Sequence, residues 1–262
     1  MKKELKWAIV LAVIGGLLTT VAFVMAFTTA GVRTFGFVDT PGAVDTVYPL
    51  APPDSQPTDG TLRYQRPWFS QKIFYFHVPL AEASLLVFTL AAVFAVLFLI
   101  KRKKSYDTRS YVGMETTLVF SVGTMITGVL WTIPSWLSDW TQIVPVMMAE
   151  PRLVTYLFML LLVVAYFVLR NSIDDEERRA VYSSVFAIVA WLSAPITFFI
   201  TRINPNGQHP VVFQSGMDPS NLIPFILGQL GMLALGFAIY SLRIAEESSR
   251  EALAVIKDSF EG

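Results

Sequence analysis

Six long apolar runs constrain this chain of 262 residues more than any other feature. A helix needs about 20 apolar residues to cross a bilayer, and six stretches come close to that length or exceed it. They are residues 7–30, 73–100, 111–133, 153–169, 181–201 and 222–242. Only 15% of the residues are charged, against about 25% in soluble domains. The runs predict an all-α polytopic membrane protein with six transmembrane helices, folded as a single integral membrane domain over residues 1–262.

The distribution of Lys and Arg predicts the orientation, because cytoplasmic loops carry an excess of them. The side with both termini, residues 101–110 and residues 170–179 holds 14 of the 20 basic residues. We therefore expect cytoplasmic N- and C-termini, a multi-pass protein of the plasma membrane, and functional loops on the extracytoplasmic side. The outer loops lie at about residues 31–72, 131–152 and 202–221, and a cytoplasmic tail at about 243–262. The first run is too long for a signal-peptide core, so we expect it to be retained.

Composition excludes several functions. The 20 Lys and Arg balance 20 Asp and Glu, so no basic excess points to nucleic acid. Cysteine is absent, which excludes disulfides, thiolate metal sites and thioether attachment on this chain.

The chain has two histidines, His77 and His209, 132 positions apart. The predicted topology places both at the outer membrane face. Histidine is the commonest metal ligand and binds heme iron through a ring nitrogen. One imidazole from each loop could clamp a heme lying edge-on at the bilayer surface. Each could equally be an interfacial polar group bonded to a neighbouring carbonyl. A catalytic zinc site is disfavoured, since zinc enzymes typically use three protein ligands.

Three of the six tryptophans, Trp131, Trp136 and Trp140, fall within ten residues of the second outer loop. They fit an interfacial aromatic belt or a platform for a porphyrin ring. Arg152 at the end of this loop could pair with a heme propionate or anchor a helix at the headgroups. Glu82 and Glu115 fall in or near apolar runs, where carboxylates are costly and often functional.

Several motifs resemble those of the CcmC family, heme-handling membrane proteins of cytochrome c maturation. Residues 73–79, Ile-Phe-Tyr-Phe-His-Val-Pro, resemble the family's Ile-Met-Tyr-Ile-His-Val-Pro entry to the second helix. Further matches are Trp131 and Trp136 at the start of its tryptophan-rich loop, Glu-Pro-Arg-Leu-Val-Thr at 150–155, Ser-Ala-Pro-Ile at 193–196 and His-Pro-Val-Val at 209–212. The likeness covers about residues 71–212.

The resemblance implies a function and a site. Heme b would be bound transiently, with His77 and His209 as iron ligands. Trp131, Trp136, Trp140, Glu150 and Arg152 would flank it. The implied partners are a heme chaperone and ABC-transporter-like ATPase and permease subunits. The family's Trp-Trp-x-Trp-Asp stretch is replaced by residues 146–150, Val-Met-Met-Ala-Glu. The chain therefore resembles a divergent member with a degraded tryptophan-rich loop, whose platform is either lost in part or rebuilt from Trp140 and the methionines.

Three function classes follow. The first is a non-enzymatic module that binds heme reversibly and delivers it, and it is the one we expect. The second is a heme-free permease subunit of an ABC-type exporter. The third is an integral heme enzyme, ranked last because such enzymes usually need more histidines. In the first outer loop, Arg63 and Arg66 are further candidates for contacts with propionates.

Overall fold

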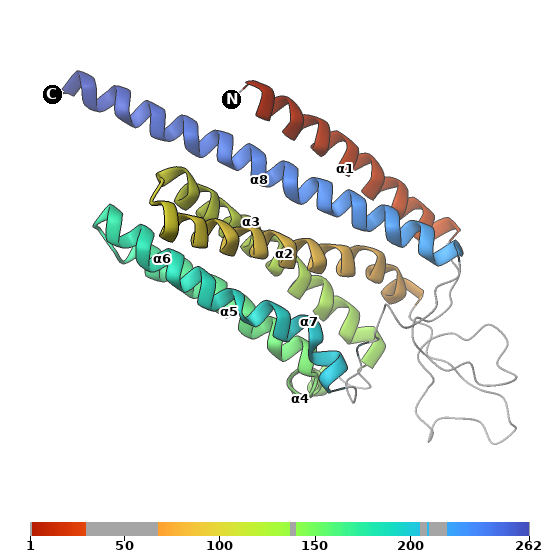
Figure 1. Cartoon of the computed structure of the whole chain (residues 1–262). Coiled ribbons are helices and arrows are strands. Elements are labelled where there is room, and N and C mark those ends of the chain that lie inside the picture. The colour runs from red at the N-terminus through yellow and green to blue at the C-terminus, as the bar shows by residue number, and fades with distance from the viewer. Residues whose placement is uncertain (1, 30–67, 137–139, 205–208, 210–218, 262) are drawn as a thin grey trace, which may run out of the picture.

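The computed structural model of the chain describes residues 2–29, 68–136, 140–204, 209 and 219–261. Within these residues it is entirely helical apart from short connections (Figure 1). The elements are α1 (Lys2–Thr28), α2 (Trp68–Lys101), α3 (Lys104–Trp136), the 3-10 helix η2 (Trp140–Gln142), α4 (Ile143–Ala149), α5 (Pro151–Asn171), α6 (Glu176–Trp191), α7 (Ser193–Ile203) and α8 (Pro219–Glu261). Six spans are long and apolar enough to cross a membrane, with α6 and α7 forming one of them. The expected all-α, six-helix membrane architecture is confirmed.

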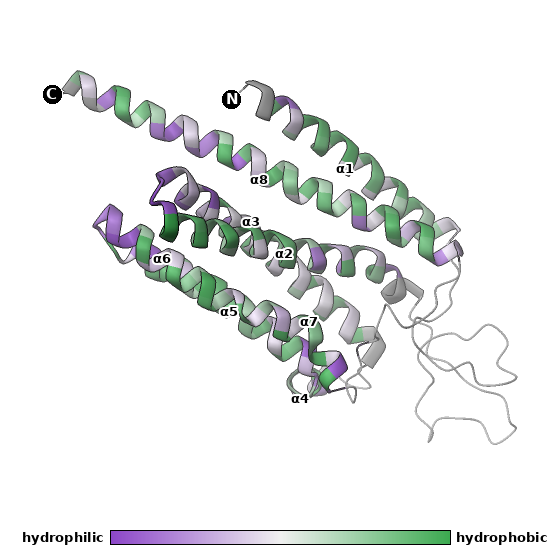
Figure 2. Ribbon diagram, in the orientation of Figure 1, coloured by the Kyte–Doolittle hydropathy of each residue, from purple (hydrophilic) through white to green (hydrophobic). Residues whose placement is uncertain are grey.

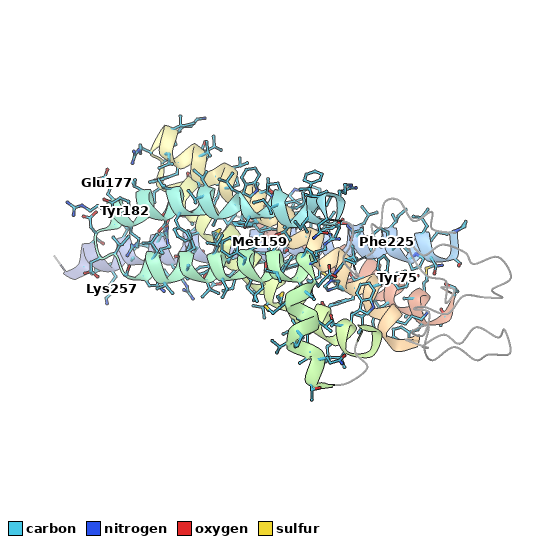
Figure 3. The ribbon with its side chains drawn as sticks, turned by 90° about the horizontal axis from the view of Figure 1, so that it is seen from below. Tyr75, Met159, Glu177, Tyr182, Phe225 and Lys257 are labelled. Carbon is cyan, nitrogen blue, oxygen red and sulfur yellow. The ribbon has the colours of Figure 1, made fainter. Side chains whose placement is uncertain are left out.

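The helices lie roughly along one direction and leave both termini at the same end of the bundle (Figure 1). α1 packs along α8, α2 packs along α3, and α5 with α6 and α7 completes the bundle. Polar residues gather at the terminal end, on the first turns of α3 and α6 and the last part of α8 (Figure 2). Figure 3 shows Glu177 and Lys257 at this end and Tyr75 and Phe225 at the other, with Met159 between them. We call the end near Tyr75 the site end.

The core combines large side chains with alanines where helices meet, and such small residues allow the close backbone approach that stabilises membrane bundles. Its largest cluster joins α2, α3, α5, α6 and α7 and includes Phe88, Met114, Met159, Ala187 and Ala190, each fully buried. The outer surface of the bundle carries exposed apolar side chains, such as those of Leu17, Leu161 and Val189. A helix that is apolar on every face is suited to lipid on its outer side.

The helices extend beyond several of the predicted runs, and three differences are the most informative. The third helix begins at Lys104 rather than near residue 111. The fifth span is two helices, because Pro195 lacks the N–H that would continue the hydrogen-bond ladder. The sixth helix runs to Glu261 instead of ending near residue 242, so the segment 243–261 prolongs α8 as a helix.

Two glycines allow α1 and α8 to touch. A Cβ on Gly15 would lie 2.9 Å from the carbonyl oxygen of Gly231, and a Cβ on Gly231 would lie 2.7 Å from the backbone nitrogen of Thr19. Both contacts are to backbone atoms, which cannot rotate away. The neighbouring Gly16 has nothing within 4 Å of its Cβ position.

We expect Gly15→Leu to separate α1 from α8 and lower the unfolding free energy by about 1–3 kcal/mol, the usual cost of overpacking. Gly16→Leu is the matched control and should cause no loss of stability, since its side chain enters open space. Thermal unfolding of both variants in detergent measures the difference. Equal melting temperatures would contradict the close helix contact.

Candidate functional site

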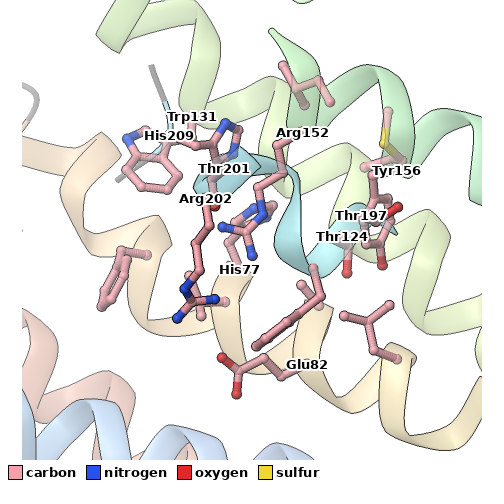
Figure 4. A pocket seen from close by; sticks show the side chains of 17 residues that line it. His77, Glu82, Thr124, Trp131, Arg152, Tyr156, Thr197, Thr201, Arg202 and His209 are labelled. Carbon is pink, nitrogen blue, oxygen red and sulfur yellow. The ribbon is translucent and has the colours of Figure 1, made fainter. Parts of the chain in front are cut away.

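A cavity lies at the site end, among the first turns of α2 and α5, the last turns of α3 and α7, and His209 (Figure 4). Its polar lining residues are His77, Glu82, Thr124, Trp131, Arg152, Tyr156, Thr197, Thr201, Arg202 and His209. Apolar side chains such as Phe74, Leu85 and Phe198 complete the wall. An apolar pocket with a few convergent polar groups is the usual form of a small-molecule site.

His77 reaches the cavity from α2. Its side chain is buried, and its Nδ1 lies 2.9 Å from the hydroxyl oxygen of Thr127 on α3. Gly128 follows Thr127, and a Cβ there would lie 3.1 Å from His77 Cε1. The absence of a side chain at Gly128 therefore lets α3 approach the imidazole closely.

His209 reaches the same cavity from the connection after α7. Its Nδ1 lies 3.2 Å from Glu150 Oε1, and the two side chains are 9% and 2% exposed. Burial is the main cause that lowers the pKa of His209 below its usual value, Arg152 adds to this, and Glu150 partly offsets it. The lowered pKa favours the neutral imidazole, the form in which histidine binds metals.

Trp131 contacts both imidazoles. Its ring centroid lies 5.9 Å from that of His77 and 6.3 Å from that of His209, with interplanar angles of 72° and 70°. The indole is 7% exposed and packs in a cluster with Phe74 and Phe225. It therefore anchors the two histidines to the aromatic core at this end of the bundle.

Two arginines line the cavity. Arg152 occupies the first turn of α5 and interacts electrostatically with Glu82 and Glu150. Arg202 occupies the last turn of α7, where its guanidinium lies 5.7 Å from the ring centroids of both Phe198 and Phe199. The cavity thus offers two cationic groups beside two imidazoles.

The sequence-predicted residues fall into three groups. His77, His209, Trp131 and Arg152 line one cavity, and Glu150 contacts His209. Glu82 also lines the cavity and hydrogen-bonds to Gln229 of α8. Glu115 lies elsewhere and pairs bidentately with Arg243, at 3.0 and 2.7 Å.

The remaining candidates either fall outside the residues that the structure describes or do not line the cavity. Arg63 and Arg66 are not among the described residues, nor are the side chains of Trp136 and Trp140. Met147 and Met148 belong to α4 and are not among the residues that line the cavity.

Sequence reasoning missed Thr127, Tyr156 and Arg202 as site residues. Thr127 precedes Trp131 by one helical turn, and Tyr156 follows Arg152 by one turn. Residues four apart share a helix face, so each candidate could have pointed to its neighbour. Arg202 is signalled only by its place at the outer end of an apolar run.

Six spanning helices and a cavity that collects both histidines define a multi-pass membrane protein with a ligand site at one end of its bundle. A family model described as CcmC, Heme exporter protein C, matches residues 61–256. The chain belongs to this family.

Among curated proteins, the chain is similar to the heme exporter protein C of Paracoccus denitrificans, at 23% identity over 71% of this chain and 76% of that protein. It is 24% identical to the Escherichia coli K12 protein of the same name, over 67% of this chain and 69% of that protein. It is 27% identical to a putative cytochrome c biosynthesis ccmC-like mitochondrial protein of Marchantia polymorpha, over 60% of this chain. The chain covers 64% of the Marchantia protein's length.

Proposed function

We propose that this protein binds heme b in the cavity at the site end, with His77 and His209 as iron ligands, and delivers it during cytochrome c maturation. One observation carries the proposal. The chain's only two histidines, 132 positions apart in sequence, line the same cavity and contact the same tryptophan.

The donor set fits this cargo. Heme brings its own four equatorial nitrogens and needs the protein for axial ligands, which two imidazoles supply. Among the described residues, no group of three His, Asp or Glu is placed to hold a bare metal ion. The planar guanidinium groups of Arg152 and Arg202 suit carboxylates such as the propionates, and Phe74, Phe198 and Trp131 provide apolar surface for the ring.

The proposal also covers the membrane and the partner proteins with which this chain acts. The Lys and Arg bias supports a position of the cavity at the extracytoplasmic face of the plasma membrane, where a heme chaperone would collect the heme. An ATPase and a permease related to ABC transporters would be separate subunits. The protein binds and releases heme without covalent catalysis.

The test is a hemin titration of the purified protein in detergent, followed by oxidised and reduced absorption spectra. Because the chain has only two histidines, any polyhistidine tag must be removed first. We expect a Soret band that saturates at one heme per chain and sharp reduced bands typical of two imidazole ligands. Protein-free micelles control for hemin dissolved in detergent. A chain that stays colourless would overturn the proposal and favour the heme-free permease.

A further inference from the structure

We propose that Thr127 and Glu150 are positioning residues, each holding one imidazole by its Nδ1–H so that the Nε2 side of the ring is presented to heme iron. This inference rests on the proposed function, because it assigns these residues a role toward the same cargo. Metal-binding histidines almost always donate their second ring N–H to a carboxylate, carbonyl or water. On the Nδ1 side, His209 meets the carboxylate of Glu150, and His77 meets the hydroxyl of Thr127, which can also accept.

The direction of the His77 hydrogen bond follows from what Thr127 does with its own proton. The Thr127 hydroxyl donates to backbone oxygens of α3, 2.9 Å from Gly123 and 3.1 Å from Thr124. A hydroxyl has one hydrogen to donate and two lone pairs to accept. When that hydrogen goes to a backbone oxygen, the 2.9 Å contact with His77 Nδ1 runs from the imidazole to Thr127. Nδ1 carries the proton, which leaves the Nε2 lone pair as the metal-binding one.

The close contact between His209 and Glu150 favours the same orientation of the imidazole. Glu150 Oε1 lies 3.2 Å from His209 Nδ1, at ion-pair distance; because an ionised carboxylate only accepts, a proton between the two atoms belongs to the imidazole. The direction is the same for a neutral and for a charged ring. A carboxylate that is only 2% exposed would be costly to bury without such a partner.

The local structure around Glu150 supports a role beyond folding of its helix. Glu150 is the N-cap residue of α5, yet its side chain makes no capping hydrogen bond. An N-cap side chain normally accepts from the backbone N–H groups of the first turn. Here the carboxylate turns to His209 instead, and thereby ties the start of α5 to the segment after α7. Departures from local preference of this kind are expected at functional sites.

The two supports differ in strength. A carboxylate raises the basicity of the imidazole that it accepts from, whereas the neutral hydroxyl of Thr127 does so less. His209 should therefore be the stronger donor to iron and His77 the weaker. A stronger donor stabilises the oxidised iron, because second-shell hydrogen bonding is one of the controls on heme potential.

The test compares heme release and reduction potential in four variants. Glu150→Leu removes the acceptor, and Glu150→Gln keeps an acceptor but removes its charge. Thr127→Val removes the hydroxyl with nearly the same shape, and Thr127→Ser should restore wild-type behaviour. Glu115→Gln and Thr116→Val are controls: Glu115 pairs at the opposite end, and the Thr116 hydroxyl donates to Val112 away from the cavity.

We expect Glu150→Leu to release heme to apomyoglobin about 10- to 100-fold faster than wild type, the usual cost of losing an outer-shell partner. The rate of heme release from Glu150→Gln should lie between those of wild type and Glu150→Leu. Its reduction potential should shift to more positive values. Thr127→Val should also release heme faster and shift the reduction potential to more positive values, but by less than the Glu150 variants. The control variants should match wild type in both measurements.

The outcomes separate this inference from the proposed function. If the wild-type chain does not bind heme, the proposed function fails. If wild type binds heme and neither Glu150→Gln nor Thr127→Val changes its release or potential, the positioning roles are wrong and the proposed function stands. These two variants are close in shape to the native residues, so they carry the test even if Glu150→Leu fails to fold.

Discussion

Replacing His209 or His77 with alanine is expected to abolish the low-spin spectrum of bound heme. Alanine has no lone pair to offer, and no third histidine exists to replace the lost ligand. Loss of an outer-shell partner typically costs about 10- to 100-fold in metal affinity, so loss of the ligand itself should cost more. Hemin titrations of each single variant and of the double variant, read by absorption and electron paramagnetic resonance, measure the effect.

Added imidazole provides the matched control for this result. His77 is only 8% exposed. Its replacement by alanine therefore leaves a space of imidazole size beside Thr127. Free imidazole should enter that space and restore the low-spin spectrum in the single variants. If His209→Ala keeps the wild-type spectrum, His209 is instead an interfacial polar group held by Glu150, and the second axial ligand is another residue.

The convergence of His77 and His209 could be predicted from the sequence because alternating membrane crossings bring every second connection to the same face. Six apolar runs and the bias of basic residues were sufficient for that step. Trp131 was predictable for the same reason, since it ends the third run. The residues that line the cavity include both histidines, Trp131 and Arg152.

Thr127 and Arg202 carry only weak sequence signals, because the apolar pattern of a membrane helix does not by itself mark the face that turns inward. Lipid and core both select apolar side chains, so periodicity does not reveal which positions line a cavity. The face of α3 that carries Thr127 and Trp131 is set by how α2 and α5 pack on it. Only that packing brings the Thr127 hydroxyl to the imidazole of His77.

The length of α8 was missed for a different reason. Hydropathy falls at Arg243, where the sixth apolar run ends. Charged side chains end a membrane span but not a helix, and Arg243 pairs with Glu246 and Glu247 while Arg250 pairs with Glu246. Pairs spaced three or four residues apart support a helix in water. The extension also contacts α3, where Thr108 donates to Glu251 at 2.9 Å.

A second large effect is expected at the terminal end, from the ion pair between Asp107 and Arg170. Two hydrogen bonds of 2.9 and 2.7 Å join the carboxylate to the guanidinium, and the side chains are only 11% and 12% exposed. Removing one partner of a buried pair leaves an uncompensated charge, which costs about 3–5 kcal/mol. We expect Asp107→Asn to lower the unfolding free energy by about that amount, measured by SDS titration in mixed micelles.

Glu176→Gln is the matched control, because Glu176 also lies in the first turn of its helix and also pairs with a cation. Its pair with Lys104 is 64% and 60% exposed, and exposed pairs contribute only about 0–1 kcal/mol. The two carboxylates differ in burial rather than in chemistry, so the difference between the variants isolates the cost of a buried, unpartnered Arg170. Replacing Asp107 and Arg170 together by uncharged residues should recover part of the loss. Equal losses in Asp107→Asn and Glu176→Gln would contradict the buried pair between α3 and α5.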